Sequence, residues 1–203
     1  MTLAEPDRRR IAAAIREAET RSSGEIVCVL AETSTGVTVL PVLIAAVLAL
    51  ALPWLLVAVT ALAVQRILEL QAALFLVLAV VLSLPRIRVA LLPRAMRRAL
   101  AHRRAMDQFR SLGIARKTDR AGILIFVSLA ERYARIVADE GIAARVRQPQ
   151  WQAAVDTLTA HMREGRVADG FISAIDACSE VLATHFPASG PGKAELPDRI
   201  YVV

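Results

Sequence analysis

Two long apolar runs dominate the pattern of hydrophobic and polar positions along the chain. Residues 37–64 contain no charged side chain, and a second run extends from Ala72 to Leu84 after the partly polar stretch Gln65–Gln71. An uncharged apolar run of about 18 residues or more is typical of a membrane-spanning helix. Because two spans return the chain to the side it left, the segments on either side of this hairpin can fold together as one domain.

The two predicted spans differ in length and in charge. As a helix, residues 37–64 would rise about 42 Å, which exceeds the hydrocarbon core of about 30 Å, and Pro53 is expected to kink this helix. The second span, residues 67–84, would rise about 27 Å, and it includes Glu69 near one end, where the carboxylate can reach the headgroups. A half-buried re-entrant segment is the alternative for the second run.

The segment before the hairpin predicts one helix followed by one strand. Apolar residues recur at helical spacing from Leu3 to Ala18, and the helix begins either in a capping box formed by Thr2 and Glu5 or at Asp7. Residues 25–31 form a short β-branched run, which predicts a buried strand that leads directly into the hairpin.

The segment after the hairpin predicts the remainder of an α/β domain. A helix over residues 94–112 is followed by two strands, 122–129 and 133–138, which form an antiparallel hairpin. Two further helices, 148–164 and 168–185, and an edge strand over 196–203 are expected after them. The fold class is therefore α/β, with helices packed on a small sheet that the transmembrane hairpin interrupts after its first strand. This reading divides the chain into residues 1–36, the hairpin with its juxtamembrane segment over 37–92, the rest of the domain over 93–187, and a tail over 188–203.

The distribution of charged residues predicts which side of the membrane the termini face. The chain has a net charge of +6, 56% hydrophobic residues and a mean hydropathy of +0.48. Between Pro85 and Met106 there are seven arginines and no acid, and the first five of them are the expected lipid-headgroup contacts: Arg86, Arg88, Arg94, Arg97 and Arg98, followed by Arg103 and Arg104. Arginine beside a span marks the cytoplasmic side. The sequence thus predicts a multi-pass protein of the inner (plasma) membrane with both termini cytoplasmic, and no nucleic-acid partner because aromatic residues do not alternate with these arginines.

Residues that often carry catalysis are few and dispersed. His102, His161 and His185 fall in three different predicted helices without metal-ligand spacing, and Cys28 and Cys178 lie in apolar surroundings typical of buried reduced thiols. Phosphate-binding loops and nucleophile elbows are absent from the sequence. No catalytic or cofactor-binding residue is predicted, and a divalent cation is the one cofactor that the sequence leaves open.

Three acids are the candidates for such a cation. Asp119 precedes the strand at 122–129, and Asp139 and Glu140 follow the strand at 133–138. In an antiparallel hairpin the start of one strand lies beside the end of the next, so these acids can gather at one edge and hold a hard cation or act in acid–base chemistry. The alternative is two solvated turns whose charge Arg116, Lys117 and Arg120 neutralise.

Four segments resemble the TPM-domain family, whose members include a thylakoid lumen acid phosphatase, a photosystem II repair protein and an acetylcholine-receptor accessory protein. They are the strand opening at 23–29, the central strand at 120–127, the hairpin end at 135–142, and the helix junction in which Arg163-Glu164-Gly165 precedes Asp169-Gly170. The resemblance implies an α/β sandwich and an accessory role at membrane complexes. The chain departs from the family at Ala121, where asparagine is usual, at Asp139-Glu140, which replace Gly-Tyr, and at Gln148, where an acid is common.

Three functions follow from these observations. The first is a non-catalytic accessory protein whose cytoplasmic TPM-like domain engages another membrane protein or complex. The second is a membrane-tethered phosphatase, and the third is a binder of anionic lipid or nucleic acid through the arginine cluster. The absence of a catalytic constellation favours the first.

Overall fold

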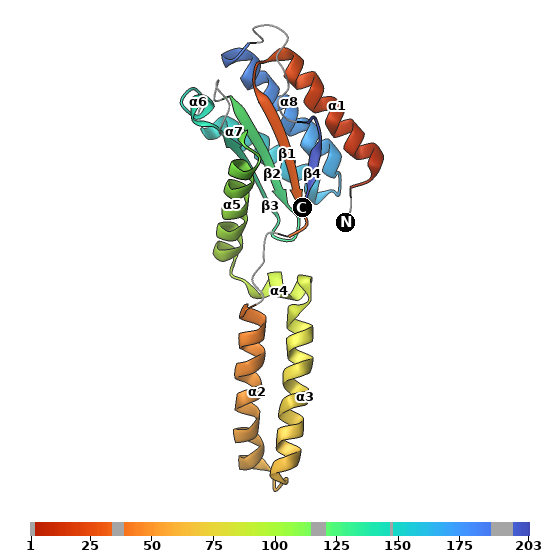
Figure 1. Ribbon diagram of the computed structural model, residues 1–203, viewed down its shortest axis with the longest axis vertical. Coiled ribbons are helices and arrows are strands. Elements are labelled where there is room, and N and C mark those ends of the chain that lie inside the picture. The colour runs from red at the N-terminus through yellow and green to blue at the C-terminus, as the bar shows by residue number, and fades with distance from the viewer. Residues whose placement is uncertain (1–2, 34–38, 115–120, 147, 188–196) are drawn as a thin grey trace. The chain divides into compact units, whose positions relative to one another are not determined.

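The computed structural model describes residues 3–33, 39–114, 121–146, 148–187 and 197–203 (Figure 1). The chain divides into two compact units, Met1–Ser34 with Arg98–Val203, and Thr35–Arg97. The helices and strands, in chain order, are α1 (Glu5–Arg21), β1 (Glu25–Ala31), α2 (Val39–Val59), α3 (Val64–Ser83), α4 (Pro85–Leu91), α5 (Arg94–Ser111), β2 (Gly122–Ser128), β3 (Tyr133–Ala138), α6 (Glu140–Ala143), α7 (Gln148–Arg163), α8 (Val167–His185) and β4 (Ile200–Val202).

One four-stranded sheet, in the order β3-β2-β1-β4, forms the centre of the larger unit. β1 pairs in parallel with β2 along its whole length, from Glu25 opposite Gly122 to Ala31 opposite Ser128. β4 adds to the other side of β1 in parallel, and β3 pairs with β2 in the antiparallel sense that its short connection predicts. The strand before the hairpin is thus central, and its partners all come after the hairpin, which confirms the interrupted α/β domain.

Helices cover both faces of this sheet. α1, α7 and α8 pack on one face, where Ile26, Cys28 and Leu30 of β1 join the main apolar core, and α5 covers the other face, where Val27 and Val29 pack (Figure 1). Every residue of β1 and of β2 is buried. This double coverage explains why both strands have a continuous apolar sequence rather than an alternating one.

Local residue chemistry sets the ends of several elements. α1 begins at Glu5 with a proline in its first turn, and its N-cap residue, Ala4, makes no side-chain cap bond. The helix thus begins two residues before the expected start at Asp7, and Thr2 lies outside the described residues. Gly113 and Gly165 adopt positive φ angles of 72° and 77° just beyond α5 and α7, a conformation that favours glycine at helix ends. Gly122 is required for space, because a Cβ at this position would overlap the Ile114 side chain.

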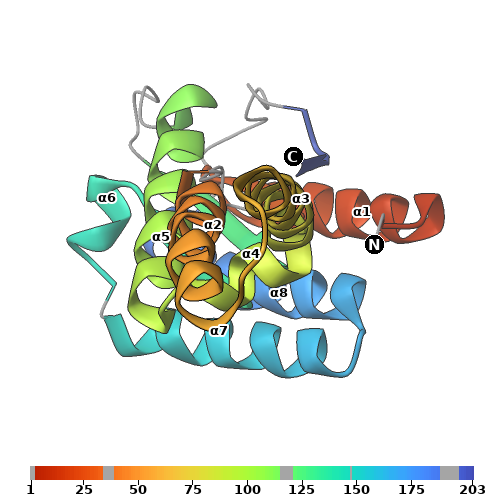
Figure 2. The same ribbon diagram turned by 90° about the horizontal axis from the view of Figure 1, so that it is seen from below.

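In the smaller unit, α2 and α3 pack side by side (Figures 1 and 2). With 21 and 20 residues, both are long and apolar enough to cross a membrane, by length and composition. Ala45 and Ala49 of α2 are buried, whereas most large apolar side chains of the pair are exposed. Pro53 lies inside α2, and the helix continues past it.

α3 begins three residues before the expected start of the second span at residue 67, and the two helices of the hairpin connect over residues 60–63. Arg66 and Glu69 pair at 3.1 Å one turn apart at the start of α3. The short helices α4 and α6 were not expected, and both are too short for a periodic sequence signal.

Candidate functional site

The acidic edge predicted from the sequence forms in part. The backbone N–H of Asp139 donates to the carbonyl of Gly122 at 2.9 Å, so the end of β3 lies beside the start of β2 as expected. The Asp139 carboxylate accepts from the N–H of Glu140 at 2.8 Å and thereby caps α6, while its second oxygen is buried without a hydrogen-bond partner. Asp119 lies outside the described residues. Within the described part of the chain, no group of three or more His, Cys, Asp or Glu side chains could hold a metal ion.

The histidines and cysteines lie where the sequence places them. His102 is on α5, His161 on α7 and His185 at the end of α8, and a ring nitrogen of His161 bonds the Thr157 carbonyl at 3.0 Å. Desolvation, with a smaller effect from nearby Arg135, lowers the pKa of His102. Cys28 and Cys178 are free and fully buried. Burial raises the pKa of Cys178 to about 12 and that of Cys28 well above its ordinary value, so neither is an activated nucleophile.

The arginine cluster continues along α5. The side chains of Arg94 and Arg98 are exposed, and Arg97 is half-buried with its Nε atom lacking a partner. Arg86 and Arg88 lie in α4, and their side chains are outside the described part. α5 buries a narrow face of Ala101, Ala105 and Phe109 against the sheet, so the rest of its surface carries the remaining arginines: Arg103, Arg104 and Arg110.

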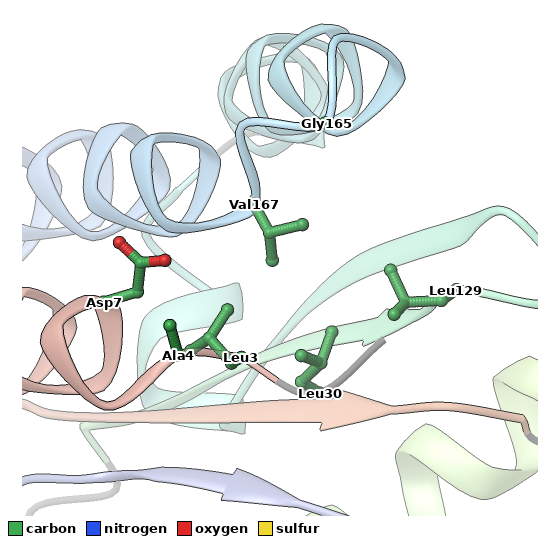
Figure 3. Close-up of a pocket in the computed structure, with 7 residues that line it drawn as sticks. All are labelled: Leu3, Ala4, Asp7, Leu30, Leu129, Gly165 and Val167. Carbon is green, nitrogen blue, oxygen red and sulfur yellow. The ribbon is translucent and has the colours of Figure 1, made fainter.

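A pocket of about 230 Å³ opens at the carboxyl ends of β1 and β2 (Figure 3). Its wall is mainly apolar, and Asp7 on the first turn of α1 is the charged residue that lines it. The lining residues are Leu3, Ala4, Asp7, Leu30, Leu129, Gly165 and Val167. Ligands of open α/β sheets commonly bind outside the carboxyl ends of parallel strands. Sequence reasoning did not find this pocket, because its residues come from segments far apart in the chain and share no motif.

A buried polar network follows the same strand ends. The Glu131 carboxylate, 6% exposed, accepts from the Ser128 hydroxyl and from the Thr33 hydroxyl, the latter at 3.1 Å. These bonds join the residues after β1 to those after β2.

A second cluster of carboxylates lies at the opposite, amino-terminal corner of β1. Burial first, and then the nearby Asp198 carboxylate, raise the pKa of Glu19 from 4.5 to about 8, and Glu25 adds a smaller effect in the same direction. Asp198 pairs with the exposed Arg16 at 3.3 Å through Oδ2, and a side-chain hydrogen bond between Glu19 and Asp198 also contributes to the raised pKa of Glu19. This corner was also missed, because Glu19 and Asp198 are distant in sequence.

Comparison with known proteins identifies the domain. The TPM domain family matches residues 84–181, from the end of the hairpin to α8. This segment of the chain is a TPM domain. In this structure the TPM domain extends beyond the matched residues, since β1 lies at the centre of the same sheet as β2.

A solved structure supports the same fold for this domain. The NMR structure of the BA42 protein from the psychrophilic bacterium Bizionia argentinensis is similar with a TM-score of 0.64 and 20% identity, over 100% of this chain and 97% of that chain. No curated protein matches the chain. The backbone carbonyl of the buried Ala121 accepts a hydrogen bond from the Glu25 N–H at 3.0 Å, which joins the starts of β1 and β2.

Proposed function

We propose that this protein is a multi-pass inner-membrane protein with both termini in the cytoplasm, and that its TPM domain acts by binding another membrane protein rather than by catalysis. The observation that carries the proposal is the hairpin itself. Apart from Leu91, Met96 and Val203, every large apolar side chain that is exposed in the described residues lies between Val39 and Leu84. A helix pair that is apolar on nearly all sides is stable when lipid surrounds it.

The helix lengths agree with this environment. α2 and α3 would span about 31 Å and 30 Å, close to the thickness of the hydrocarbon core. Exposure of so many leucine and valine side chains to water would cost about 25 cal/mol for each Å² of apolar surface. Arg66 and Glu69, the charged residues of α3, pair with each other near its first turn, where headgroups and water are within reach.

The two tryptophans allow a direct test of insertion. Trp54 lies on α2 and is 82% exposed, whereas Trp151 is buried in the TPM domain. In liposomes with brominated acyl chains, the Trp151→Phe variant should lose most of its fluorescence, because Trp54 would contact the lipid tails. The matched Trp54→Phe variant, which retains only Trp151, should keep its fluorescence. Equal quenching of the two variants would contradict the membrane placement of α2.

Topology can be tested with single cysteines. Arginines flank the hairpin on both sides while its turn region carries only the Arg66–Glu69 pair, so the turn should face away from the cytoplasm. In intact cells, a Glu69→Cys variant should react with an impermeant maleimide, and a Ser189→Cys variant should not. The native Cys28 and Cys178 are fully buried and provide a low background. Labelling of both positions from the same side would eliminate the two-span arrangement.

The phosphatase alternative rests on the TPM domain and on the acidic edge at Asp139. Since the Asp139 carboxylate caps α6, the geometry supports a structural role. We expect the purified protein to hydrolyse phosphate esters at the same background rate as an Asp139→Ala/Glu140→Ala variant, with or without divalent metal. A metal-dependent rate that disappears in the double variant would favour the enzyme over the accessory protein.

The exposed arginines on α5 support a second candidate function, which is binding to anionic lipid. Arg94 and Arg98 start a helix on which Asp107 is the single acid. Attraction to anionic headgroups amounts to about 1 kcal/mol per arginine near the surface and weakens with salt. Amide exchange in α5 should therefore slow in nanodiscs that contain anionic lipid, and this protection should decrease at high salt. Identical exchange in neutral and anionic nanodiscs would exclude this contact.

A further inference from the structure

A basic surface lies where α5 packs against β3. Successive side chains of a strand point to opposite faces of its sheet, and Tyr133 and Val137 of β3 lie on the face that α5 covers, whereas Ile136 joins the core on the other face. Arg135 stands between Tyr133 and Val137 in this alternation, so its side chain also lies on the α5 face. Because Arg135 is exposed, its guanidinium lies beside α5 and is open to solvent.

α5 contributes two further nitrogen-bearing side chains to this surface. Desolvation first, and then the charge of Arg135, lower the pKa of His102, so the imidazole and the guanidinium are close in space. Arg98 is exposed and precedes His102 by one turn of α5, and residues four apart on a helix are neighbours. We call Arg98, His102 and Arg135 the α5–β3 site.

Acidic side chains do not neutralise the α5–β3 site within the described part of the chain. Asp107, the single acid of α5, lies about 140° around the helix from His102. Neither Arg98 nor Arg135 pairs with a carboxylate among the described residues. The Nδ1 atom of His102 is buried without a hydrogen-bond partner, which leaves Nε2 as the nitrogen that can donate to a ligand. The site is therefore a group of three donors whose mutual repulsion an anion would relieve.

We infer that the α5–β3 site binds a phosphate monoester, the headgroup chemistry of phosphatidic acid. A monoester carries a charge of about −1.5 to −2 near neutral pH and has three strong acceptor oxygens, so each of the three side chains can donate to an oxygen of its own. Arginine suits this role because its planar guanidinium matches the phosphate geometry. A phosphodiester has one terminal oxygen fewer and a single negative charge, so it should bind less tightly.

The order of elements along the chain favours a lipid as the source of the phosphate. Arg98 follows the end of α3 at Ser83 after one short helix, α4, so the chain itself keeps the start of α5 near the surface of the membrane that α3 is proposed to cross. A soluble phosphate ester presents the same group, and the test separates the two sources. This inference rests on the second candidate function, binding to anionic lipid, and names the headgroup and the residues that recognise it.

The first arm of the test titrates glycerol 3-phosphate into the full chain in phosphatidylcholine nanodiscs and follows the nitrogen resonances of the histidine rings by NMR. His102 should respond, and His161, whose ring already bonds the Thr157 carbonyl, is the internal control. Dimethyl phosphate, a diester, should bind about tenfold more weakly. Arg135→Gln should weaken binding of the monoester about tenfold, because it removes one charge-assisted pair. Arg104→Gln, an exposed position on another side of α5, is the matched control and should leave binding unchanged.

The second arm identifies the source of the phosphate. Nanodiscs with phosphatidic acid should shift the His102 resonance, and nanodiscs with phosphatidylglycerol at equal surface charge should not. A response to phosphatidic acid supports a lipid headgroup, and a response to glycerol 3-phosphate alone supports a soluble phosphate ester at the same site. No response in either arm, equal binding of dimethyl phosphate, or unchanged binding by Arg135→Gln would each overturn the proposal. Slower amide exchange of α5 in anionic nanodiscs with an unresponsive His102 would exclude this site and leave general lipid binding intact.

Discussion

The free energy of unfolding of the TPM domain should decrease as the pH rises, and replacing Glu19 by glutamine should prevent this decrease. In the folded protein, burial and the Asp198 carboxylate raise the pKa of Glu19 from 4.5 to about 8. The folded state therefore holds a proton that the unfolded state releases at lower pH. This contribution to stability is fully present below about pH 4.5 and is lost as the pH rises through about 8.

The size of the effect follows from the shift and from the exposure of the side chain. In a fully dry site, a shift of this size would correspond to about 5 kcal/mol. Glu19 is only half-buried, so solvent screening reduces the expected contribution to about 1–2 kcal/mol. Glutamine mimics the protonated acid at every pH, so the variant should equal the wild type near pH 4.5 and exceed its free energy of unfolding by this amount at pH 9.

Urea unfolding followed by Trp151 fluorescence provides the assay. A Trp54→Phe background leaves Trp151, which is buried in α7, as the reporter of the domain. Glu17→Gln is the matched control, because Glu17 is exposed on the same helix and pairs with Arg21. A wild type and a Glu19→Gln variant whose stabilities change in parallel between pH 5 and pH 9 would refute the assignment of this carboxyl.

Three further changes should have measurable effects on stability. Gly122→Ala should lower the free energy of unfolding by about 1–3 kcal/mol, because the new Cβ overlaps the Ile114 side chain, and an unchanged urea midpoint would show that this contact relaxes freely. Arg132→Gly should raise stability by about 1 kcal/mol, because Arg132 has a φ of 49° in the turn after β2, and a lower thermal midpoint would contradict this strain. Joining Ser34 to Arg98 with a flexible linker should yield a soluble folded domain, whereas a chain that begins at Arg98 should be less stable because it lacks β1; equal midpoints would mean that β1 is not part of the core.

Local sequence patterns were sufficient to predict most elements of this protein. Apolar runs without charge indicate α2 and α3, and the short β-branched runs at Glu25–Ala31 and Tyr133–Ala138 predict strands with the observed bounds. The antiparallel pairing of β2 and β3 followed from a four-residue connection, which permits no other arrangement. These features depend on interactions between residues that are close in the sequence, so the sequence alone is sufficient to predict them.

Long-range contacts required the tertiary structure. The sequence could not show that β4 would pair in parallel with β1, nor that Glu19 would meet Asp198, because more than 170 residues separate each pair. The pocket at the carboxyl ends of β1 and β2 arises in the same way from Asp7, Leu30 and Val167. The burial and the charge environment of a side chain depend on all the residues that pack around it. In this chain the hairpin separates β1 in sequence from β2 and β4, so only the folded structure shows which residues become neighbours.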